Sequence, residues 1–314
     1  MALGFLLVLF FVPETAYRRE HSLELDLLAN DSNEAIQTTT EERSEEKTAQ
    51  STTISQAEVP QKATFLQQMM PFNGRKTDEN FFKLLFRPFP LFFHPAVIWA
   101  CLIQGVIIGW TVMVGVILSL IFLGPPLFFN EEKAGKMYTS AFIGSILGLV
   151  LSGIYSEVVT NFMIRRNKGK YEPEFRILLV LPTMVTAAIG LYGFGITAND
   201  VKHYGWIVPE VLLAFIIISM VMGAIASAQY LLDAHRDIAV EAFTNLLIFK
   251  NMFSFVLAYN AYNWVFKIRI KHLFIIFGSL EVAICFLAVP MYIYGKKNRD
   301  YFHRHDILKM VGLR

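Results

Sequence analysis

Two ionisable residues stand inside long apolar stretches of this 314-residue chain. Glu281 lies near the middle of one stretch, and Lys250 lies about two helical turns into another, followed by Asn251 and Ser254. A charged side chain is costly in hydrocarbon, so such residues pair with a neighbour or mark an ion pathway. We therefore expect the carboxyl group of Glu281 to be protonated, to be paired with a neighbour, or to be part of a proton route. Lys250 can instead extend its long side chain to the water interface.

Two uncharged polar residues occupy one face of an earlier apolar stretch. Gln104 and Thr111 are separated by two helical turns, which places them one above the other if the stretch is a helix. Their side chains can hydrogen-bond a ligand or simply a neighbouring helix. Both alternatives stay open at the level of the sequence.

Other charged residues are expected at the ends of these stretches. Glu210 follows Pro209 near a predicted helix start, where a carboxylate is stabilised by exposed backbone N–H groups. Five cations fall within residues 165–176, here called the basic loop, and Arg165 and Arg166 open it. Glu157 lies just before this loop, so we expect an ion pair between its carboxylate and the loop.

The composition indicates that these residues belong to a membrane protein. The chain is 54% hydrophobic and only 17% charged, with a mean hydropathy of +0.45, and the apolar residues are gathered in runs. A membrane-spanning helix needs about 20 apolar residues. We predict an all-α, polytopic membrane protein whose spans cover approximately residues 95–123, 137–164, 177–198, 206–232, 242–266 and 273–294.

The basic loop fixes the predicted orientation of the spans. Lys and Arg concentrate in short cytoplasmic loops, so we expect residues 165–176 and both termini on the cytoplasmic side. The cations at Lys267, Arg269 and Lys271 fall on the opposite side and depart from this rule. The expected location is therefore an integral membrane protein with cytoplasmic termini, in the plasma membrane.

The remaining segments are polar or short. Residues 1–13 are mostly apolar but too short to span a bilayer. Residues 14–90 are rich in Ser, Thr, Glu and Gln and predict a cytoplasmic, largely disordered loop, with a short interfacial helix near residues 81–87. We expect a six-helix bundle over residues 91–295 and a cytoplasmic tail over residues 296–314. Cys101 and Cys285 are expected to be buried thiols without a disulfide.

Small residues recur at helical spacing within the spans. Gly105 and Gly109 form one such pair, and Gly144 and Gly148 form another. Close packing of small residues holds helices together in lipid, so these stripes predict packing seams, part of which could also line a cavity.

Several stretches, in this order and spacing, resemble fungal-type transporters of the major facilitator superfamily, closest to the drug:proton antiporter branch. The resemblance rests on Phe11–Tyr17, Gly153–Glu157, Arg165–Gly169, Tyr171–Arg176, Tyr204–Pro209, Tyr230–Asp237, Phe249–Phe255 and Pro290–Lys296. Such transporters commonly have Asp at the position of Glu157. The matching regions cover residues 1–20 and about 85–305 of this chain.

The resemblance implies two six-helix halves with the substrate bound between them. This chain then corresponds to the end of helix six and the C-terminal half, a truncated form whose partner would be a missing N-terminal half. It implies transport of a small organic solute, a drug, toxin or polyamine-like compound, coupled to protons. The alternative is a non-transporting membrane protein that needs a separate N-terminal half.

Residue roles follow from the same resemblance. The candidates for the substrate cavity are Gln104, Thr111, Asn251 and Ser254. The candidates for coupling or gating are Glu157, Arg165, Arg166, Lys250 and Glu281. The sequence contains no metal-ligand spacing, glycine-rich phosphate loop or nucleophile motif. We therefore expect no enzyme activity, no cofactor, no metal and no nucleic-acid partner; the expected partners are the lipid bilayer, the solute and protons.

Overall fold

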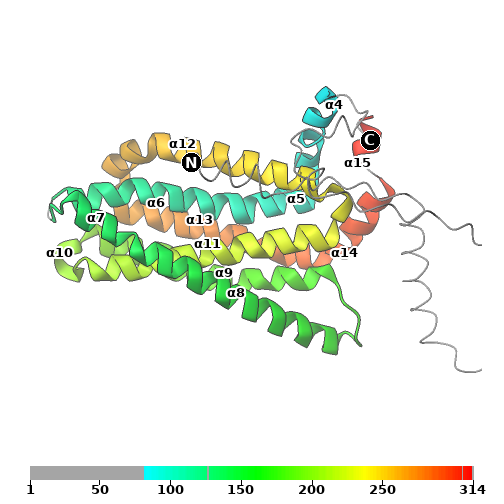
Figure 1. Ribbon diagram of the computed structural model, residues 1–314, viewed down its shortest axis with the longest axis horizontal. Helices are drawn as coiled ribbons and strands as arrows, with labels where there is room; N and C mark the ends of the chain where they lie inside the picture. Colours follow the sequence, from blue (N-terminus) through cyan, green and yellow to red (C-terminus); the bar gives the residue numbers. More distant parts are fainter. Residues whose placement is uncertain (1–80, 126, 306, 313–314) are drawn as a thin grey trace, which may run out of the picture. The chain divides into compact units, whose positions relative to one another are not determined.

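The computed structural model describes residues 81–125, 127–305 and 307–312 (Figure 1). The expectations for residues 1–13 and for residues 14–80 of the predicted loop lie outside this part of the chain. Within it, the backbone forms helices joined by short connections and no β-strand. The all-α prediction is confirmed.

Among the described residues, six helical segments are long and apolar enough to cross a bilayer, as predicted from the sequence. They are Pro95–Leu123, Glu131–Arg166, Pro173–Asn199, Ile207–Ala234, Arg236–Ile268 and Ile270–Phe302. Most extend beyond the predicted bounds because the helical backbone continues through polar residues at the water interface, which hydropathy leaves out. The chain is an integral, polytopic membrane protein.

The first span contains an irregular turn. It consists of α5 (Pro95–Ala100), a π-helical turn η2 (Cys101–Gly105) and α6 (Val106–Leu123). His94 caps α5, since its side chain accepts a hydrogen bond from the backbone N–H of Ala96 at 3.2 Å. Single π-turns inside α-helices are frequent at functional sites, and this one contains Gln104.

The second and third spans are joined by the basic loop. Their helices are α7 (Glu131–Met137), α8 (Thr139–Arg166), η3 (Pro173–Leu179) and α9 (Val180–Asn199), followed by the short α10 (Val201–Tyr204). Helix α8 ends where Lys168 and Gly169 adopt positive φ values of 55° and 81°, and the N–H of Gly169 bonds back to the carbonyl of Ile164 at 2.9 Å. Glycine adopts this left-handed conformation without steric cost.

The last three spans begin with α11 (Ile207–Ala234). After η4 (Arg236–Ile238) come α12 (Ala239–Ile268), α13 (Ile270–Phe286) and α14 (Ala288–Arg304), then α15 (Ile307–Met310). The sixth span is therefore two helices, and α14 continues into the segment predicted as a tail. The short helix predicted near residue 81 is present as α4 (Phe81–Phe86), followed by η1 (Phe89–Phe93).

Glycines set the distances between the spans. Helix α11 packs against α8 and α9, and α12 packs against α6. A Cβ at Gly144 would lie 2.8 Å from the carbonyl oxygen of Ala214, and a Cβ at Gly190 would lie 2.8 Å from the backbone nitrogen of Ile216. Both glycines therefore touch the α11 backbone directly, and the packing-seam interpretation of Gly144 is confirmed.

Burial is uneven among the six spans. Within the described residues, 56% of the apolar window of the first span is buried, but only 22% of the windows of the second and the fifth. Helices α8 and α12 therefore carry the largest uncovered apolar faces of the bundle.

Candidate functional site

Gln104 and Thr111 both face α11. The Oε1 atom of Gln104 accepts a hydrogen bond from the Ser227 hydroxyl at 3.2 Å. The Thr111 hydroxyl lies 2.7 Å from the carbonyl oxygen of Ile108 in its own helix and 3.3 Å from the sulfur of Met220. In this arrangement both side chains bond neighbouring protein groups. Of the two alternatives that the sequence left open, this corresponds to hydrogen bonding within the protein and not to a ligand.

Asn251, Ser254 and Lys250 lie on α12, which packs against the span that carries that pair. Asn251 is exposed and the other two are half-buried, and none of the three side chains makes a hydrogen bond or ion pair with the described residues. Helix α12 instead turns Phe249 toward η2 and Phe253 toward α6. No hydrogen bond among the described residues joins Asn251 or Ser254 to Gln104 or Thr111, so the cavity shared by these four residues stays a prediction.

Glu281 is fully buried, at 0% exposure, between two spans. The indole N–H of Trp110 donates to its Oε2 atom at 3.0 Å, and the thiol of Cys285 lies 3.9 Å from Oε1. Trp110 in turn stacks on Phe277, with ring centroids 4.1 Å apart. Among the described residues no cation pairs with this carboxyl group. Its partners are one donor from the first span and one thiol on its own helix.

Glu210 lies in the first turn of α11, as expected, but it bonds another helix. Its Oε2 atom accepts a hydrogen bond from the Ser140 hydroxyl at 2.5 Å. The carboxyl is buried and joins the beginnings of α8 and α11. A link between two spans therefore replaces the expected cap within one helix.

The expected ion pair between Glu157 and the basic loop is not formed. Glu157, Arg165 and Arg166 are exposed, and none of them takes part in an ion pair within the described residues. The buried stripe of α8 passes through Ser156 and Thr160, so the neighbouring Glu157 projects from the outer face. The helix rotation separates this carboxylate from the loop.

Arg176, at the other end of the basic loop, makes the contacts instead. Its Nη1 atom donates to the Ser156 hydroxyl at 2.6 Å, and its Nε atom donates to Asp233 Oδ2 at 3.1 Å. The Tyr171 hydroxyl also donates to Asp233. One guanidinium group thus connects η3 to α8 and to the end of α11.

A second ion pair lies beside this one. Arg299 of α14 approaches Glu174 of η3 at 3.5 Å, and Glu174 is almost fully buried. Gly295 allows this approach, because a Cβ there would lie 2.9 Å from the Glu174 side chain. We call the group of Ser156, Tyr171, Glu174, Arg176, Asp233 and Arg299 the end network.

The end network joins four spans at one end of the bundle, through α8, η3, α11 and α14. Burial and the hydrogen bond to Asp233 raise the pKa of Tyr171 above its ordinary value, so the phenol remains a proton donor at neutral pH. Such a network can hold the helix ends together in one conformation and release them in another. It contains carboxylates, guanidinium groups and hydroxyls but no arrangement suited to covalent catalysis.

The sequence placed these residues inside recognised motifs but gave them no role. Arg176 and Asp233 fall within Tyr171–Arg176 and Tyr230–Asp237. A carboxylate at the end of one predicted span and an arginine at the start of another were the available signal. The pairing could not be predicted, because the basic loop contains five cations and their spacing does not indicate which of them reaches a buried partner.

The chain is similar to several fungal proteins. It is 27% identical over 190 residues to Protein HOL1 of Saccharomyces cerevisiae, covering 60% of this chain and 32% of that protein. It is 26% identical to the MFS-type transporter penM of Penicillium rubens, covering 72% of this chain and 44% of that one. It is 25% identical to the major facilitator superfamily multidrug transporter FLU1 of Candida albicans, covering 67% and 34%.

These similarities support the resemblance found in the sequence motifs. Several of the relatives are named as transporters, which agrees with the expectation that the chain is not an enzyme. The chain spans less than half the length of these relatives. No family model matches it, and no solved structure does.

Proposed function

Because the chain is related in sequence to fungal transporters of the major facilitator superfamily, we propose that it forms half of a membrane transporter for small organic solutes. The proposal rests mainly on the relatives that are named as transporters, and one of these relatives is named as a multidrug transporter. The proposed substrates are drug-like, toxin-like or polyamine-like compounds.

A second six-helix bundle is the partner that this proposal requires. Alternating access in this type of transporter moves two bundles around a site that lies between them. The low burial of α8 and α12 supports the proposal, since their apolar faces are available to a partner bundle as well as to lipid. Asn251 and Ser254 on α12, with Gln104 and Thr111 on the first span, are proposed to contact the solute once that partner is present.

Glu281 is the proposed proton-coupling residue. An acidic side chain inside a membrane bundle, without a cationic partner in the described residues, is a typical proton carrier. Its bond to Trp110 spans the contact between the sixth and first spans. A change in protonation would therefore alter a contact between two moving helices.

Flux measurements in proteoliposomes test the proposal. The 314-residue chain is reconstituted alone and with the N-terminal six-helix half of a similar transporter, and uptake of fluorescent drugs and labelled polyamines is followed under a pH gradient. We expect saturable flux only when both halves are present. Absence of flux in both preparations, with correctly assembled protein, would leave the non-transporting alternative.

Coupling is tested in the same preparation with Glu281→Gln. We expect this variant to lose its response to the pH gradient while retaining solute binding. Glu157→Gln is the matched control, because it removes the same charge from an exposed position. An unchanged gradient response in Glu281→Gln would remove Glu281 from the coupling mechanism.

A further inference from the structure

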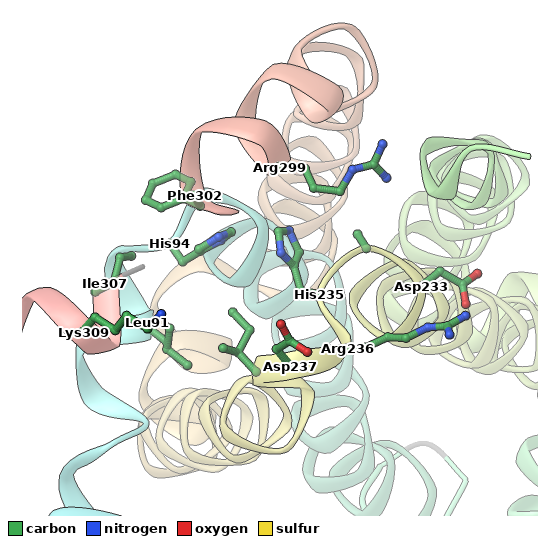
Figure 2. A pocket seen from close by; sticks show the side chains of 12 residues that line it. Leu91, His94, Asp233, His235, Arg236, Asp237, Arg299, Phe302, Ile307 and Lys309 are labelled. Atoms are coloured by element: carbon green, nitrogen blue, oxygen red, sulfur yellow. The ribbon is translucent and has the colours of Figure 1, made fainter. Parts of the chain in front are cut away.

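A polar cavity of about 450 Å³ opens at the end of the bundle that carries the end network (Figure 2). It lies between the start of the first span, the α11–α12 connection and the α14–α15 segment. Its polar lining includes His94, His235, Arg236, Asp237 and Lys309. Of the described residues that line it, Asp233 and Arg299 belong to the end network.

His94 presents an unpartnered donor at this cavity. The side chain is only 2% exposed, and its Nδ1 atom accepts the Ala96 N–H at 3.2 Å. Nδ1 therefore carries no proton, and the hydrogen of the neutral ring is on Nε2. That Nε2 is buried and has no hydrogen-bond partner among the described residues. An orphaned buried donor calls for an acceptor supplied by a ligand or water.

His235 extends the same polar surface. Its ring meets that of His94 edge to face, with centroids 4.6 Å apart, and its Nε2 atom is also without a partner among the described residues (Figure 2). Burial lowers the pKa of His94 to about 3, with a further contribution from His235. Burial and then the charge of Arg299 lower the pKa of His235 to about 4. Both rings are therefore neutral at pH 7.

Among the described residues that line the cavity, the remaining charges have a positive excess. Asp233 is already bonded to Arg176, and Arg299 to Glu174. Arg236, Lys309 and Asp237 form no ion pair with the described residues. Two cations against one carboxylate, with a neutral N–H donor beside them, suit an anionic group rich in acceptor oxygens, such as a phosphate.

An apolar groove of about 800 Å³ adjoins the polar cavity. The two share Phe302 and Ile307 in their linings, and the groove is further lined by aromatic residues of α4 and η1 and by the α15 segment. Phe93 is 82% exposed there, and Met310 is 75% exposed. Exposed aromatic and aliphatic side chains at the end of a set of spans are typical of the membrane interface.

We propose that the cavity and the groove together bind one anionic glycerophospholipid. The phosphate lies in the polar cavity, where Arg236 and Lys309 supply charge and His94 Nε2–H donates a hydrogen bond. An acyl chain lies along the groove past Phe93. The site is independent of transport, so its test does not depend on the function proposed above.

Native mass spectrometry of the purified, delipidated 314-residue chain tests this site. Dioleoylphosphatidylglycerol and dioleoylphosphatidylcholine are titrated separately, and we expect the anionic lipid to bind roughly tenfold more tightly. In Arg236→Gln/Lys309→Gln this preference should fall to near parity. Lys168→Gln/Lys170→Gln is the matched control: it removes the same charge from exposed loop positions outside the cavity, and the preference should persist.

Two further variants separate the head-group and acyl contributions. His94→Asn keeps an acceptor that can cap α5 but removes the Nε2–H donor, so it should weaken binding of the anionic lipid severalfold. Phe93→Ser changes an exposed side chain and should weaken the binding of both lipids to the same extent. Circular dichroism confirms that each variant is folded, and His94→Asn keeps the test decisive if the double variant does not fold.

Three results would overturn the proposal. The first is equal affinity of the unaltered chain for the two lipids. The second is an equal loss of preference in the Lys168→Gln/Lys170→Gln control, which would show a diffuse surface-charge effect. The third is complete displacement of the lipid by glycerol 3-phosphate at a similar concentration, which would identify a soluble phosphate ligand instead of a lipid.

Discussion

At the scale of single residues, one arginine of the basic loop has a structural role that its neighbours lack. Arg176 bonds Ser156 and Asp233 together, so Arg176→Gln leaves two partly buried partners without their cation. We expect the free energy of unfolding to fall by about 1–3 kcal/mol. Arg165→Gln, at an exposed position, should change it by less than about 0.5 kcal/mol. Denaturation of the detergent-solubilised chain, followed by fluorescence, compares the two variants.

Arg165 and Arg166 remain candidates for gating rather than for stability. Replacing both with Ala should change the transport rate in an assembled two-half transporter without shifting the unfolding midpoint. An exposed ion pair contributes only about 0–1 kcal/mol, so no large loss of stability is expected. Transport at the full rate by the double variant would contradict a gating role.

The His94–His235 pair makes stability depend on pH. Both folded-state pKa values, about 3 and about 4, lie below the ordinary histidine value of 6.5. The unfolded chain therefore binds more protons below pH 6.5, and stability present above that pH is lost as the pH falls toward 4. For His94 alone the loss at pH 5 is about 2 kcal/mol.

Thermal unfolding between pH 7.5 and pH 5 measures this dependence. We expect His94→Asn to flatten it, because Asn does not titrate but can still cap α5. His272→Asn is the control, since it removes a histidine from an exposed position. An unchanged pH dependence in His94→Asn would show that other groups are responsible.

At the scale of the helices, the close contact of α8 with α11 depends on a missing side chain. A Cβ at Gly144 would meet the α11 backbone, whereas a Cβ at Gly153 of the same helix would meet nothing within 4 Å. Gly144→Ala should separate the helices and destabilise the bundle by about 1–3 kcal/mol. Gly153→Ala should be neutral or stabilise it by up to about 1 kcal/mol, because Ala is the better helix former. Unfolding midpoints of the two variants that do not differ would contradict the packing-seam interpretation.

At the scale of the whole molecule, the direction of the spans is a prediction from the distribution of Lys and Arg. Cys101 and Cys285 are buried free thiols, so an introduced cysteine can be labelled against a low background. Lys170→Cys should react with an impermeant maleimide only after cells are permeabilised, because the basic loop is predicted to be cytoplasmic. Lys202→Cys, between the third and fourth spans, should react in intact cells. The reverse pattern would invert the predicted orientation.

The number and approximate bounds of the spans, and the short helix near residue 81, were determined by the sequence. This is possible because lipid requires a long apolar run for every crossing, a signal that each segment carries by itself. The glycine pairs were interpretable for a similar reason, since their spacing on one helix defines a seam before its partner is known.

Which residues meet between two packed helices was decided only by the tertiary structure. Spacing within a helix gives the face that carries Gln104, Thr111 or Asn251 but not the rotation of that helix against the next, so a cavity shared by these residues stays a prediction. The same rotation turns Glu157 outward and brings Arg176 to Asp233, although the sequence favoured Arg165 and Arg166. His94, His235 and Lys309 are far apart along the chain, and only the packing of helix ends brings them to one cavity.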